Sequence, residues 1–202
     1  HERSQDKFIF TEEDKIIYKD KLFPYWTGKS MKDSIVAAID DEIMESVNEK
    51  IVNLNQTDKG QGHIIPGFEM ILDNGLGSLI EKVSRKAGEN DFYKAAKITL
   101  EAARDHILRY GYLADELLKN EKNDVRKDDL KRISEVSKKV AVEKPESFLE
   151  ALQLLWYICV ILQHESNASS ISLGRIDQYL YKFYENDIKS GVPKEELKEY
   201  LE

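Results

Sequence analysis

The feature that most constrains the fold is a nine-residue apolar run, LLWYICVIL (154–162), followed directly by a polar tract, QHESNASSISLGRID (163–177). A transmembrane helix needs about 20 consecutive apolar residues. The run is therefore too short to span a bilayer, and we expect no membrane association. Because its apolar residues surround nearly the whole helix, it predicts a helix that the rest of the chain covers on all sides.

Most of the remaining sequence is typical of helices. Apolar residues recur at three- and four-residue steps through 91–117, which predicts one long amphipathic helix capped by Asp91. Pro145 is expected to begin the helix that contains the apolar run, and residues 23–30 and 53–65 are expected to be a break and a loop. Further helices are expected at 11–22, 33–52, 66–74, 76–86, 124–140, 177–189 and from 193 onward.

One short segment does not fit a purely helical chain. Residues 169–175, SSISLGR, alternate weakly between polar and apolar side chains, which is typical of a short strand. A single strand cannot make a sheet. Either the strand interpretation is wrong, or the chain is part of a larger protein.

Composition and charge exclude several classes of function. The chain is 41% hydrophobic and 34% charged, as expected of a folded domain. Its net charge is −8, and lysine and arginine are scattered among the acids, so no basic surface for nucleic acid is expected. A single cysteine, Cys159, excludes an intrachain disulfide and a cysteine-cluster metal site, and it fits a cytoplasmic protein.

Few residues suggest chemistry by themselves. Cys159 lies within the apolar run, where burial would disfavour a thiolate, so we expect an inert core residue. His63 lies in a glycine-bordered loop, where it either reaches a cleft or has a surface or structural role. His106 and His164 lack the spacing of a metal site, and no metal is expected. Arg175 and Asp177 are expected to form a structural ion pair at the end of the polar tract.

The polar tract allows two interpretations. Its small side chains could bind a small polar substrate without adding charge, or they could cap helices and form turns. The residues alone do not decide between these readings. They are Asn167, Ser169, Ser170 and Ser172.

Several segments, in order along the chain, resemble the glycyl radical enzymes, the pyruvate formate-lyase-like family. They are PYWTGKS (24–30), GHIIPGFEMILDNGLGSLIEK (62–82), FYKAAKITLEAARDHILRYGYLADEL (92–117), KPESFLEALQLLW (144–156) and ESNASSISLGRIDQYLYKFYENDI (165–188). The resemblance implies that residues 1–202 are the mainly α, N-terminal helical part of a ten-stranded α/β barrel, with at most one or two short strands. It also implies a partial domain that lacks the catalytic cysteine loop and the C-terminal glycyl radical domain.

The family resemblance also implies a function. The intact protein would be a lyase or dehydratase that cleaves a C–O, C–N or C–C bond of a small polar substrate. Its glycyl radical would be installed by an S-adenosylmethionine-dependent iron–sulfur activase, and it would be a cytoplasmic homodimer used anaerobically. This segment would hold no cofactor and no catalytic residue, and it would be inactive without the rest of the barrel. The alternative is a stand-alone helical binding or interaction module without catalysis.

The resemblance also suggests four substrate-binding residues. His63 best matches a loop residue that contacts substrate in several subfamilies, and Asn55 is a weaker candidate. Ser170 matches a serine that hydrogen-bonds substrate in diol dehydratases. Ser169 stands where those enzymes have a histidine, which argues against a glycerol or propanediol substrate. Hydroxyproline fits no worse, and choline cleavage and arylacetate decarboxylation remain open.

Overall fold

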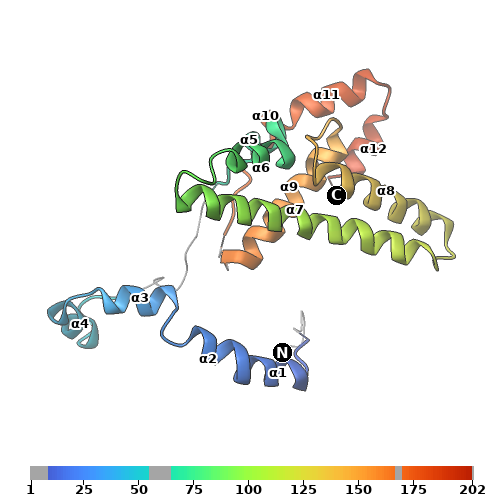
Figure 1. The fold of residues 1–202 in the computed structure, drawn as a ribbon. Helices are drawn as coiled ribbons and strands as arrows, with labels where there is room; N and C mark the ends of the chain where they lie inside the picture. The colour runs from blue at the N-terminus through green and yellow to red at the C-terminus, as the bar shows by residue number, and fades with distance from the viewer. Residues whose placement is uncertain (1–8, 55–64, 167–169, 202) are drawn as a thin grey trace. The chain divides into compact units, whose positions relative to one another are not determined.

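The structure, a computed structural model, describes residues 9–54, 65–166 and 170–201. The chain divides into two compact units, residues 1–60 and 61–202. Every regular element in the described ranges is a helix (Figure 1), which confirms the mainly α prediction.

The first unit consists of short helices. A capping box between Thr11 and Asp14 starts the first of them, at the start of the helical region expected at 11–22. A second capping box, between Ser30 and Asp33, starts a later helix. The elements are α1 (Glu12–Ile17), a π-helical turn (Tyr18–Leu22), α2 (Phe23–Trp26), α3 (Met31–Ala37) and α4 (Asp41–Asn48).

Two predictions in this unit were wrong. The expected break at 23–30 is helical as far as Trp26, because Pro24 lies in the first turn of α2, where a missing backbone N–H is tolerated. The single helix expected at 33–52 is two helices, α3 and α4. Acidic residues in the first turn of α4, Asp41 and Glu42, favour a new helix start at that point.

The second unit contains a hydrophobic core made by eight helices. Within it, α7 and α8 run side by side in opposite directions (Figure 1). Ile107, Val140 and Leu154, from α7, α8 and α9, are fully buried in this core. The helices are α5 (Phe68–Asn74), α6 (Leu76–Ser84), α7 (Asp91–Leu118), α8 (Asp124–Val140), α9 (Phe148–Ser166), α10 (Ile176–Tyr179), α11 (Tyr181–Lys189) and α12 (Lys194–Glu199).

The first turn of α6 lies against the loop after α8. A Cβ atom built on Gly77 would lie 2.1 Å from the carbonyl oxygen of Val142, which is closer than atoms can pack. A residue without a side chain is therefore required where α6 meets this loop.

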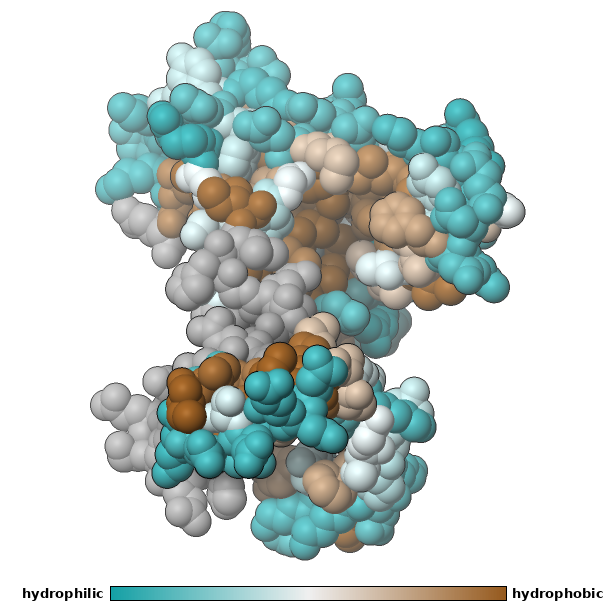
Figure 2. Space-filling view, turned by 90° about the vertical axis from the view of Figure 1, so that its left-hand side faces the viewer, coloured by the Kyte–Doolittle hydropathy of each residue, from teal (hydrophilic) through white to brown (hydrophobic). Residues whose placement is uncertain are grey.

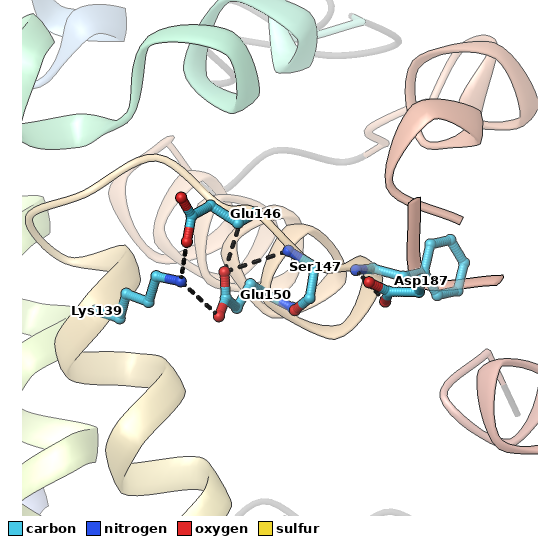
Figure 3. A network of polar contacts seen from close by, with 6 residues as sticks. Lys139, Glu146, Ser147, Glu150 and Asp187 are labelled. Carbon is cyan, nitrogen blue, oxygen red and sulfur yellow. Dashed lines mark hydrogen bonds and ion pairs between the residues drawn. The ribbon is translucent and has the colours of Figure 1, made fainter. Parts of the chain in front are cut away.

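The start of α9 differs from the prediction. The helix begins at Phe148 rather than at Pro145, because Ser147 and Glu150 form a capping box in which each side chain accepts a backbone N–H of the other residue. Asp187 of α11 accepts the backbone N–H of Phe148 at 2.8 Å, and Lys139 contacts Glu150 at 3.0 Å (Figure 3). Polar contacts from two other helices thus hold the start of α9.

The expected burial along α7 and α9 holds only in part. On α7, Ala103, Ile107, Gly111 and Ala114 are buried, but Phe92 near its start is 73% exposed, and Asn90 rather than Asp91 caps the helix. On α9, Trp156 is 63% exposed, although its neighbours Leu155 and Tyr157 are buried. Figure 2 shows hydrophobic side chains on the outer surface among hydrophilic ones.

Candidate functional site

The candidate site is the segment between α9 and α10 that carries Ser170. Ser170 and Ile171 are partly buried, and residues 172–175 are exposed. His63, Asn55 and Ser169 lie outside the described residues. The strand expected at 169–175 is absent from its described part, 170–175, where Ile171 forms an isolated bridge.

Three close contacts lie along this segment. The Tyr179 hydroxyl donates to the carbonyl oxygen of Leu173 at 2.7 Å. Gly174 has a φ of +67°, in the left-handed region, and a Cβ atom built on it would lie 3.0 Å from Cγ2 of Ile65. Arg175 donates to both carboxylate oxygens of Asp177, at 2.9 and 2.7 Å, which confirms the expected ion pair.

The contact between Gly174 and Ile65 brings together two regions that are about a hundred positions apart in the sequence. Ile65 directly precedes the Pro66–Gly67 turn into α5, and it follows the loop that contains His63. Among the described residues, Ile65 and Gly174 thus meet within the second unit.

Tyr179 connects this place to the core. Its ring centroid lies 6.2 Å from that of Phe68, the first residue of α5. Burial is the main cause that raises the pKa of Tyr179 to about 12, with smaller contributions from the charges of Cys159 and Glu69. The phenol therefore stays protonated at neutral pH and remains a hydrogen-bond donor.

A cavity of about 290 Å³ lies between α9 and the segment. It is lined by Trp156, Cys159, Val160, Gln163, His164 and Ile171. Burial raises the pKa of the Cys159 thiol, as the sequence predicted, so this cysteine is a protonated thiol and not an activated nucleophile.

A second polar group, between α7 and α9, was not expected from the sequence. Arg109 donates to Nδ1 of His106 at 2.9 Å, so the neutral ring carries its proton on Nε2, which is buried without a partner in the described part of the chain. Burial, followed by the charges of Arg109 and His164, lowers the pKa of His106. The three-residue spacing of His106 and Arg109 was the available signal, whereas the approach of His164 depends on tertiary packing.

The described residues offer no group of three histidine, cysteine or acidic side chains placed to hold a metal ion. Nor does any helix in these ranges combine the length and apolar character needed to cross a membrane. Of the described segment, Ile171 lines the small cavity beside α9, together with polar side chains of α9 such as Gln163 and His164.

The family of the chain follows from its whole length. The model of the family described as pyruvate formate lyase-like matches residues 1–202, and the chain belongs to this family. The sequence resemblance is thereby confirmed.

Individual relatives include glycyl radical enzymes and dehydratases. The chain is 35% identical to (2S)-3-sulfopropanediol dehydratase from Klebsiella oxytoca, with 100% of the chain and 26% of that protein covered. It superposes on a glycyl radical enzyme from Archaeoglobus fulgidus with a TM-score of 0.84 and 31% identity, covering 99% of this chain and 27% of that one.

A B12-independent glycerol dehydratase from Clostridium butyricum gives the same TM-score, 0.84, at 31% identity, with 98% of this chain and 26% of that one covered. The chain thus spans about a quarter of the length of the relatives it matches.

Proposed function

We propose that these residues are the N-terminal helical part of a glycyl radical dehydratase or lyase that acts on a small hydroxylated substrate. The observation that carries the proposal is the match of the whole chain to one family whose relatives include dehydratases. The chemistry that a radical glycine supplies in such enzymes is abstraction and return of a substrate hydrogen atom. The glycine loop and the cysteine loop belong to parts of the polypeptide outside this sequence.

The role proposed for this segment is binding and enclosure. Ser170 would hydrogen-bond a substrate hydroxyl, with Ser169, His63 and Asn55 as further contacts. A neutral hydroxyl orients a polar substrate without adding charge beside a radical. The helices around the segment would help to keep water and oxygen away from radical intermediates. The serine at position 169 argues for a substrate other than glycerol or propanediol.

The proposed partners follow from the same chemistry. An S-adenosylmethionine-dependent iron–sulfur activase would install the radical, and the remaining barrel would complete the substrate cavity. We further propose that the intact protein is a cytoplasmic homodimer. Residues 1–202 alone would give no turnover, because they contain neither of the two radical-carrying loops.

The first test is to activate the polypeptide anaerobically with its activase. An electron paramagnetic resonance doublet from a glycyl radical, together with turnover of one member of a panel of diols, hydroxyproline and sulfonated alcohols, is the expected result. Residues 1–202 alone should give neither signal. Absence of a radical in the intact polypeptide would refute the proposal. Turnover by residues 1–202 alone would refute the claim that this segment binds and encloses the substrate but carries no radical loop.

The second test concerns Ser170. Ser170→Ala should lower kcat/KM about tenfold, because loss of one hydrogen bond to the substrate removes roughly 1 to 1.5 kcal/mol. Ser190→Ala is the matched control, since Ser190 is exposed at the end of α11. Equal kcat/KM values for the two variants would exclude a substrate contact by Ser170.

A further inference from the structure

The contacts along the Ser170 segment differ in how firmly they hold it. Residues 172–175 are exposed, and the Arg175–Asp177 pair is exposed as well. Exposed ion pairs contribute little to holding a chain in place. Among the described residues, the backbone bridge at Ile171, the contact of Gly174 with Ile65 and the hydrogen bond from Tyr179 to Leu173 are therefore the contacts that hold its course.

Tyr179 is well placed to anchor the segment. It is the last residue of α10 and is partly buried against the core, whereas Leu173 is 38% exposed. The ring packs near Phe68, and the hydroxyl reaches back six residues to the Leu173 carbonyl. Removing the hydroxyl alone would leave the ring contact in place and release only the segment.

We propose that Tyr179 is a positioning residue for the substrate site. Its hydroxyl holds the Leu173 carbonyl and thereby sets the direction in which Ser170 faces the substrate. This inference rests on the proposed function of Ser170. Tyr179 itself does not touch the reacting atoms. By restricting the segment to few conformations before substrate binds, Tyr179 lowers the entropy cost of binding.

The experiment uses the full polypeptide and the variant Tyr179→Phe. Tyr181→Phe is the matched control, because Tyr181 is 57% exposed and its hydroxyl has no hydrogen-bond partner in the described part of the chain. Hydrogen–deuterium exchange of peptides covering 170–176 is measured first. We expect about a fivefold to tenfold faster exchange in Tyr179→Phe and no change in Tyr181→Phe, as loss of one hydrogen bond implies.

Steady-state kinetics then separate positioning from a general effect on the fold. Tyr179→Phe should raise KM about tenfold with less than about a threefold change in kcat, at an unchanged radical content per chain. In the Ser170→Ala background the same change should alter KM less than about twofold, because the two residues act through one contact.

Three results would overturn the inference: unchanged exchange at 170–176, unchanged KM despite faster exchange, or additive effects of the two substitutions. Failure of the proposed function looks different, because then the wild-type polypeptide shows no radical or no turnover. The exchange experiment still decides in that case whether Tyr179 anchors the segment.

Discussion

At the scale of single residues, a buried pair of hydroxyl groups makes the sharpest prediction. Ser137 is fully buried in α8, and its hydroxyl lies 2.7 Å from that of Tyr157 in α9. Ser137 also donates to the carbonyl oxygen of Ile133 at 2.5 Å, so Tyr157 must be the donor in the pair. Removing the Ser137 hydroxyl therefore leaves a buried donor unpaired, whereas removing the Tyr157 hydroxyl does not.

Ser137→Ala should destabilise the fold more than Tyr157→Phe. The alanine leaves the buried Tyr157 hydroxyl without an acceptor, which costs about 1 to 3 kcal/mol, whereas the phenylalanine removes one bond worth about 1 kcal/mol. Urea unfolding of the two variants, with the exposed Ser190→Ala as control, measures the difference. A larger loss for Tyr157→Phe would contradict the assigned direction of the hydrogen bond.

The chemistry of single residues could be predicted only where the immediate sequence determines it. Cys159 was predicted to be inert because apolar neighbours surround it in the sequence, and its raised pKa agrees. The ion pair of Arg175 and Asp177 is also local. The contact of Ile65 with Gly174 and the bond from Tyr179 to Leu173 involve the course of a whole segment, so no short pattern indicated them.

At the scale of elements, the α7–α8 pair predicts a pH dependence. Asp115 of α7 accepts hydrogen bonds from Ser134, at 2.5 Å, and from Lys138, both on α8. The bond from Lys138, followed by that from Ser134, lowers the pKa of Asp115 below its ordinary value of 3.8. Since the folded-state pKa is the lower one, the carboxylate stabilises the fold above pH 3.8, and this contribution is lost as the pH falls through the folded-state pKa.

Asp115→Asn should therefore reduce the loss of stability on acidification and lower stability at pH 7. Urea midpoints measured from pH 7 down to pH 3 test this. Asp105→Asn is the control, because the ion pair of Asp105 is with its sequence neighbour Arg104 and does not join two helices. Parallel midpoint curves for wild type and Asp115→Asn would show that the contact between the two helices contributes no pH dependence.

The helices themselves were more predictable than their ends. The periodic apolar stripe at 91–117 predicted both ends of α7 to within one residue, because a pattern of this length is unambiguous. Pro145 was a misleading start for α9, since Ser147 and Glu150 supply the cap, and Asp187 adds a contact from a distant helix. The exposure of Phe92 and Trp156 could not be predicted, because periodicity shows which side chains share a face but not what covers it.

At the scale of the whole chain, the two units differ in how they are stabilised. Among the described residues 9–54 none is buried, and Phe23, Tyr25 and Trp26 are each more than half exposed. Short helices without a core depend on capping and local contacts, which are marginal in water. The second unit has the core that spans α5 to α12.

Residues 1–202 on their own should therefore be cut by protease first within 1–60, leaving a resistant product that begins near residue 61. In the intact polypeptide, the exposed aromatic residues of the first unit would pack against the remaining barrel, and cleavage there should be at least about tenfold slower, as burial suppresses local opening. Timed digestion with mass spectrometry of the products compares the two forms. Equal cleavage rates in 1–60 would show that the rest of the polypeptide does not cover this unit, and the proposed place of the segment in a larger barrel would then lose its physical support.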